Sequence, residues 1–91
     1  MVDMKSGVVN EKIIDYLGRS MCVDLKNHNK IVGTLVFYHL TEQMIHLMNW
    51  QEFNSVGELV RQGKFMVVNR TAWFQIYNEE ENETETDSYT E

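Results

Sequence analysis

Residues 30–40 read KIVGTLVFYHL, a run with apolar side chains on both of its faces. β-branched and aromatic residues favour strands, and Gly33 near the start of such a run indicates a bend or a bulge. A bent strand that is apolar on both faces suits a small barrel, in which one strand contributes to two parts of the wall. A turn at residues 41–43 leads into MIHLMNW at 44–50, so the stretch from Lys30 to Glu52 predicts a bent strand and its return.

A short helix is predicted before the first strand. Asn10 has the side chain of an N-cap, Ile13, Ile14 and Leu17 form one apolar stripe, and Gly18 is a typical helix stop. Two helical turns are not stable alone in water. We therefore expect this helix to cover an open end of the barrel.

Five antiparallel strands are predicted in all. The first contains Cys22, the single cysteine, which its strand pattern predicts to be a buried structural thiol. Asparagines at 27 and 29 favour the positive φ of a tight connection. A polar loop with a helical turn at 58–60 is expected before the fourth strand. The strands are predicted at 20–26, 30–40, 44–52, 64–69 and 73–77, which together with the short N-terminal helix indicate a mainly β, SH3-like barrel.

Charge divides the chain into a body and a tail. The net charge is −6, but seven of the 14 acidic residues lie from Asn78 onward, and all eight Lys and Arg residues precede it. We predict a flexible N-terminus at 1–9, a barrel domain at 10–77 and a disordered acidic tail at 78–91. The tail would either solubilise the protein or fold over a basic surface and compete with a polyanionic ligand there. The near-neutral body gives no electrostatic argument for nucleic acid.

Several classes of protein are disfavoured. No apolar run approaches the ~18 residues of a membrane span, and the N-terminus lacks a secretory apolar region, so we expect a cytoplasmic protein. One cysteine allows no internal disulfide and no cysteine-based zinc site. His28, His39 and His46 lack the spacing of metal ligands, and no phosphate-binding or nucleophile motif is present. We expect no enzyme, cofactor, metal or small-molecule substrate.

Several short motifs together resemble the Sm-like family, which comprises Sm, Lsm and bacterial Hfq proteins. Gly33-Thr34-Leu35 is similar to the family's G-x-L, VDL at 23–25 matches its first strand, and Glu52 stands where an acid often closes the third strand. NRTAWFQI at 69–76, preceded by Val68, is similar to the family's I-R-G-x-x-V-x-x-I. The resemblance implies a barrel, a ring-shaped homo-oligomer and a pore-side pocket for single-stranded, often uridine-rich RNA.

The resemblance also places a candidate RNA pocket. Where the family has an Asp and an Asn after the bent strand and then an Arg-Gly, this chain has His39, Gln43 and Asn69-Arg70. The turn contains no aspartate, and the arginine is displaced by one residue. Single-stranded RNA is recognised by stacking, base-edge hydrogen bonds and positive charge. His39 or Tyr38 would stack, Gln43 and Asn69 would read a base edge, and Arg70 would meet phosphate; alternatively, these residues only pack and shape turns.

The last strand suggests how subunits would join. Its aromatic residues Trp73, Phe74 and Tyr77 form an apolar edge that invites pairing with another chain. The resemblance implies that the fourth strand of a neighbour, with Phe65 and Val67, supplies the cover, although packing within one barrel would also use these residues. We predict a homo-oligomeric ring that binds single-stranded RNA without catalysis. The alternatives are a protein-interaction or scaffold module that has lost RNA binding, and a monomeric adaptor.

Overall fold

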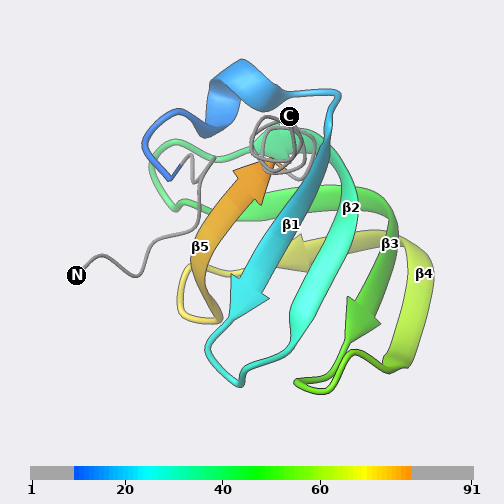
Figure 1. Ribbon diagram of the computed structural model, residues 1–91. Coiled ribbons are helices and arrows are strands. Elements are labelled where there is room, and N and C mark those ends of the chain that lie inside the picture. Colours follow the sequence, from blue (N-terminus) through cyan, green and yellow to red (C-terminus); the bar gives the residue numbers. More distant parts are fainter. Residues whose placement is uncertain (1–9, 79–91) are drawn as a thin grey trace, which may run out of the picture.

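The computed structural model describes residues 10–78, which form a single curled antiparallel sheet preceded by one helical turn (Figure 1). The strand order is β4-β3-β2-β1-β5, so that β4 and β5 are the two edges of the sheet. This confirms the mainly β class with five antiparallel strands. The elements are the 3-10 helix η1 (Ile13–Tyr16) and the strands β1 (Ser20–Leu25), β2 (Lys30–Tyr38), β3 (Ile45–Phe53), β4 (Leu59–Val68) and β5 (Trp73–Asn78).

The bend predicted at Gly33 is present, at a point where β2 pairs with β3. The register between these strands shifts between Val32 and Thr34, which marks a bulge at the glycine. A Cβ on Gly33 would lie 3.1 Å from the Cβ of Trp50 and 3.2 Å from the carbonyl oxygen of Met48. Only glycine lets the two strands approach this closely, and the sheet can therefore curl around the Trp50 side chain.

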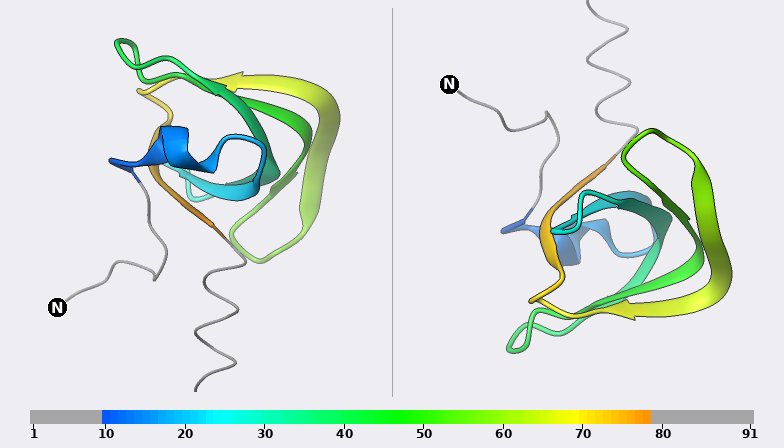
Figure 2. Two further views of the ribbon diagram at one scale, coloured as in Figure 1. Left: turned by 90° about the horizontal axis from the view of Figure 1, so that it is seen from above. Right: turned by 90° about the horizontal axis from the view of Figure 1, so that it is seen from below.

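The core lies inside the curl of the sheet. Its members come from every strand, and Cys22 is buried as a thiol, as predicted. Helix η1 lies across one end of the barrel and contributes Ile13, which is only 2% exposed (Figure 2). The buried apolar side chains that pack together are Ile13, Met21, Val23, Leu25, Ile31, Leu35, Ile45, Leu47, Trp50, Val68, Trp73 and Ile76.

The predicted N-terminal α-helix is not found, and a four-residue 3-10 helix takes its place. Ile13 is buried, but Ile14 and Leu17 are 43% and 46% exposed, so the apolar stripe that would stabilise a longer helix is not covered. Asn10 is not the N-cap, because that position falls on Lys12, which makes no side-chain capping bond. Gly18 ends the turn with φ of +87°, as expected of a helix stop.

The connection before β4 is shorter than predicted. The expected helical turn at 58–60 is wrong, because β4 already begins at Leu59. Asn54 closes the loop early: its Oδ1 accepts hydrogen bonds from the backbone N–H groups of Val56 and Glu58. In the turn between β1 and β2, a positive φ is predicted for an asparagine. The residue that adopts it is His28, with φ of +77°.

The ends of the described chain refine the predicted domain limits. Asn78, which the prediction placed in the acidic tail, is the last residue of β5 and is 1% exposed. The predicted flexible segment 1–9 and the remainder of the predicted tail, 79–91, lie outside the described residues. No helix within residues 10–78 is long and apolar enough to cross a membrane.

Glu52 anchors the far end of the barrel, where three elements meet. It is 4% exposed and accepts hydrogen bonds from Asn29 Nδ2 at 2.7 Å and from Arg61 Nη2 at 2.6 Å. Burial by itself raises the pKa of Glu52, but the hydrogen bonds from Asn29 and Arg61 and the Arg61 charge outweigh it, and the pKa is lowered. The acid that the motif places at Glu52 therefore joins the β1–β2 turn to β3 and β4.

Candidate functional site

The turn between β2 and β3 holds two of the predicted pocket residues in a fixed loop. The His39 N–H donates to the carbonyl of Met44 at 3.0 Å, and the Gln43 N–H donates to the carbonyl of His39 at 2.6 Å. Gln43 has φ of +57°, a conformation that non-glycine residues seldom adopt. These bonds fix the direction in which the side chains of the turn leave the backbone.

Gln43 and Arg70 converge at one corner of the barrel. The indole Nε1 of Trp73 donates to the Gln43 carbonyl at 3.1 Å, and the Gln43 side chain is hydrogen-bonded to Tyr38. Arg70 Nη1 donates to the Trp73 carbonyl at 2.6 Å, and its guanidinium carbon lies 4.2 Å from the centre of the Trp73 ring. Burial raises the pKa of Tyr38, against the opposing effects of the Arg70 charge and the Gln43 hydrogen bond. We call Tyr38, Gln43, Arg70 and Trp73 the turn corner.

The other two predicted pocket residues lie outside the turn corner. The His39 ring packs against Phe37, with ring centres 4.8 Å apart, and against His46 at 5.4 Å. Asn69 is exposed, and its carbonyl accepts a hydrogen bond from the Ala72 N–H within the tight turn. The structure thus brings together two of the four predicted residues.

A cluster of aromatic rings and histidines lies on the outer face of β2, β3 and β4. His46 contacts Phe37 and Phe65, with ring centres 5.1 Å and 5.6 Å apart. Burial and the neighbouring His39 both lower the pKa of His46, and its buried Nε2 has no hydrogen-bond partner. Sequence reasoning missed this cluster. A signal was present, because Phe65 and His46 each lie one residue away from a core-facing side chain of the same strand and so belong to its outer face. We call Phe37, His39, His46 and Phe65 the outer cluster.

The five predicted interface residues fall into an exposed group and a buried group. Phe65, Val67 and Phe74 are 55%, 42% and 48% exposed and lie on the two edge strands. Trp73 and Tyr77 are 1% and 3% exposed within this chain, so they are held by the barrel itself. Of the predicted interface residues, Phe74 on β5 and Phe65 and Val67 on β4 are therefore the ones whose side chains another chain could reach.

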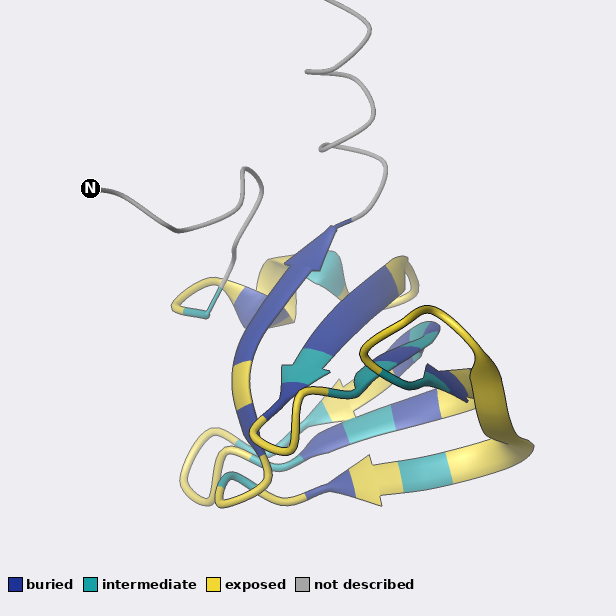
Figure 3. Cartoon of the chain, turned by 60° about the horizontal axis from the view of Figure 1, so that its bottom comes forward, coloured by how far each residue is buried: buried dark blue, intermediate teal, exposed yellow. Residues whose placement is uncertain are grey.

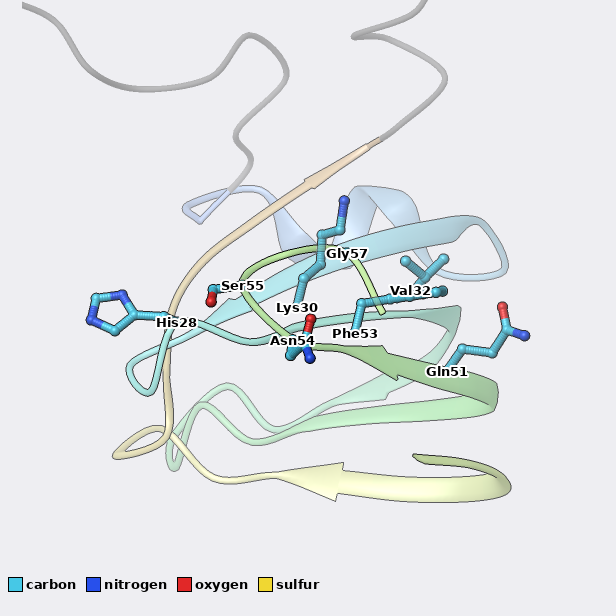
Figure 4. Close-up of a pocket in the computed structure, with 8 residues that line it drawn as sticks. All are labelled: His28, Lys30, Val32, Gln51, Phe53, Asn54, Ser55 and Gly57. Carbon is cyan, nitrogen blue, oxygen red and sulfur yellow. The ribbon is translucent and has the colours of Figure 1, made fainter. Parts of the chain in front are cut away.

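A hollow of about 560 Å³ lies between the turn before β2 and the β3–β4 loop (Figure 4). Its lining includes Lys30, Val32 and Phe53 from the strands and Ser55 from the loop, while the His28 ring points away from the others. Within residues 10–78, no three His, Cys, Asp or Glu side chains come together as metal ligands would. The hollow contains no residue of the predicted RNA pocket.

Comparison with known proteins identifies the fold. The sequence matches no protein-family model and no curated protein. A chain in the crystal structure of the NatC complex bound to CoA is similar, with 21% identity and a TM-score of 0.66 over 93% of this chain and 97% of that chain. A chain of the NatC complex bound to Gag peptide and CoA has 20% identity and a TM-score of 0.65 over 80% and 99%.

An Sm-like protein from Archaeoglobus fulgidus, AF-Sm2, is also similar. The identity is 23% and the TM-score 0.64, over 86% of this chain and 96% of that chain. Likeness at this level of identity shows the fold alone. The chain therefore has the Sm-like fold that its motifs indicate.

Proposed function

We infer that this chain, which has the Sm-like fold, is a non-catalytic assembly module that joins other chains by pairing edge strands. The observation that carries this proposal is the state of β4. Seven consecutive residues at its start, 59–65, are exposed, and no strand within residues 10–78 pairs with its outer edge. Unpaired N–H and C=O groups on a long edge strand are a template for another strand.

The side chains of β4 and the related structures support the same function. Leu59, Val60, Phe65 and Val67 are each between 42% and 55% exposed, which is costly for a strand that stays in water. A chain of the same fold belongs to the NatC complex, an assembly of several proteins. A barrel this small gains stability when a partner buries such a surface.

A strand supplied as a peptide tests edge pairing directly. The peptide TAWFQIYN, residues 71–78 with lysines added at both ends for solubility, presents the β5 sequence without its contacts to the rest of the chain. We expect it to bind and to slow hydrogen exchange of β4 amides, and we expect Phe65→Glu to weaken binding by at least about tenfold. A peptide of scrambled order with the same lysines is the control. Equal protection by both peptides, or by neither, would contradict the proposal.

RNA binding by a homomeric ring is the second candidate function, and the turn corner favours it. Gln43 offers an amide and Arg70 a positive charge beside the aromatic rings of Tyr38 and Trp73, which is the chemistry that single-stranded RNA needs. Against this, the Arg70 guanidinium already lies on the Trp73 ring and bonds to its carbonyl. The turn corner is therefore better explained as structure than as an open pocket.

A titration with uridine-rich single-stranded RNA at low salt tests this second function. A ring would show a solution mass several times that of one chain, and Arg70→Ala would lower RNA affinity while leaving that mass unchanged. Arg19→Ala is the matched control, because the Arg19 guanidinium also lies over an aromatic ring, that of Tyr16, and Arg19 is not part of the turn corner. Equal affinity of the Arg70→Ala and wild-type proteins would remove the turn corner as the RNA site.

A further inference from the structure

Two backbone groups on the outer edge of β5 are bonded to a side chain of the same protein. Asn10 Nδ2 donates to the Phe74 carbonyl at 3.0 Å, and the Ile76 N–H donates to Asn10 Oδ1 at 2.9 Å. β5 pairs with β1 along its other edge. The Asn10 carboxamide thus satisfies one acceptor and one donor that an incoming strand would use.

The segment that carries Asn10 is fixed by the core. Ile13, three residues further on, is 2% exposed and packs in the main core cluster. Ile13 begins η1, whose turn is closed by the hydrogen bond from the Asp15 N–H to the Lys12 carbonyl at 3.0 Å. Because Asn10 is held close to β5, its two bonds form at a small cost in chain entropy. We call Asn10 with its two bonds the β5 latch.

The outer edge of β4 has no counterpart to this latch within residues 10–78. Nothing among the described hydrogen bonds of side chains crosses that edge, and its ladder bonds run to β3 alone. The charged residues of the strand are Arg61, which pairs with Glu52, and Lys64. One lysine is modest protection for a ten-residue edge.

We propose that the β5 latch keeps β5 of a second copy of this chain from pairing with β4, so that the strand that docks on β4 comes from a different protein. The proposal rests on the proposed pairing through β4. A homomeric ring uses both edges of each subunit, and here Asn10 already bonds two of the backbone groups on the outer edge of β5. The complementary partner is therefore a protein with an apolar edge strand whose outer backbone groups are unoccupied. This chain then ends an assembly, or occupies one position in it, rather than repeating around it.

Opening the latch tests the proposal in the full chain. We expect the wild-type protein to have the mass of one chain in sedimentation experiments up to high micromolar concentration. Asn10→Ala should strengthen self-association at least tenfold. Asn10→Asp should do the same, because it keeps the size of the side chain but places a second oxygen against the Phe74 carbonyl. Adding Phe65→Glu to Asn10→Ala should return the protein to a monomer.

The controls separate failure of this proposal from failure of edge pairing. Asn27→Ala removes another turn asparagine, whose Oδ1 accepts from the Asn29 N–H, and should leave the mass unchanged. Thermal unfolding checks that each Asn10 variant is folded. Wild-type association as strong as that of Asn10→Ala would overturn the latch while leaving edge pairing in place. The latch would also be overturned, with edge pairing left in place, if the peptide of residues 71–78 binds to β4 but both Asn10 variants stay monomeric. Failure of the peptide and of both variants would overturn both proposals.

Discussion

β4 and β5 are the two edge strands of one sheet, yet their environments are opposite (Figure 3). In β5, every residue except Phe74 is buried. In β4, only Val68 is buried, and Met66 is intermediate. The difference cannot come from apolar content, because Phe65 and Val67 are as apolar as the buried residues of β5.

The two strands differ in what the rest of the chain places against them. Trp73 and Ile76 point into the barrel, and the buried amide of Gln75 donates to Asp24 Oδ2 of β1 at 2.6 Å. Asn10 then occupies the outer edge of β5. The described residues thus cover the edge formed by β5, and none of them covers the outer edge of β4. A small barrel can therefore cover most of one edge strand and leave the other open.

The largest expected effect comes from matched aromatic truncations in the two strands. Trp73→Ala should lower the free energy of unfolding by about 3–5 kcal/mol, because a fully buried ring leaves a cavity. Phe65→Ala should change it by no more than about 0.5 kcal/mol in the isolated chain, because Phe65 is 55% exposed. Urea denaturation measures both values. Similar costs would mean that the edges are not as different as their burial indicates.

The sequence predicts the centre of this barrel better than its edges. The strand identity of residues 30–38, the bend at Gly33 and the buried Cys22 follow from local patterns, because β-branched residues and an internal glycine have few other uses. Which edge is covered depends on contacts between residues far apart in the chain, and no local pattern contains them.

Asn10 shows this limit most clearly. An asparagine before an apolar stripe has the pattern of an N-cap, and the same carboxamide serves equally well on a strand edge. The choice is made by β5, which lies more than sixty residues away along the chain. The turn corner has the same property, since Gln43 and Arg70 meet only because β5 brings Trp73 between them.

Gly63→Ala tests how closely the middle of β4 packs against the Trp50 ring. A Cβ at this position would lie 2.9 Å from Trp50 Cζ2 and 3.1 Å from Trp50 Nε1. Overpacking of this kind costs about 1–3 kcal/mol in unfolding free energy. Lys64→Ala on the same strand is the control and should have little effect. A neutral Gly63→Ala would show that the Trp50 ring can move aside, and that β4 is only loosely attached.

Glu52→Gln should weaken the link between β4 and the rest of the barrel by about 1 kcal/mol at neutral pH, since the Arg61 side chain is largely exposed. The pKa of Glu52 is lowered in the folded chain, so its contribution is present above the ordinary pKa of 4.5 and is lost as pH falls through the folded value. Unfolding of both proteins between pH 7 and pH 3 measures this. The two stability curves should converge at acid pH, and a constant gap would contradict the assignment.

His46→Gln should change the free energy of unfolding less than the substitutions above. His46 lies on β3, and its ring is on the outer face that β3 shares with β4. The pKa of His46 is lowered in the folded chain, so below the ordinary value of 6.5 the unfolded chain binds more protons and stability falls as the pH is lowered. Replacing His46 should make stability between pH 7 and pH 5 less dependent on pH than in the wild type, with His28→Gln as the control.

Because the His46 ring touches Phe65, a partner on β4 that buries the outer cluster would lower the pKa of His46 further. Binding of the β5 peptide should therefore weaken as pH falls, and Phe65→Glu should remove that dependence together with the binding.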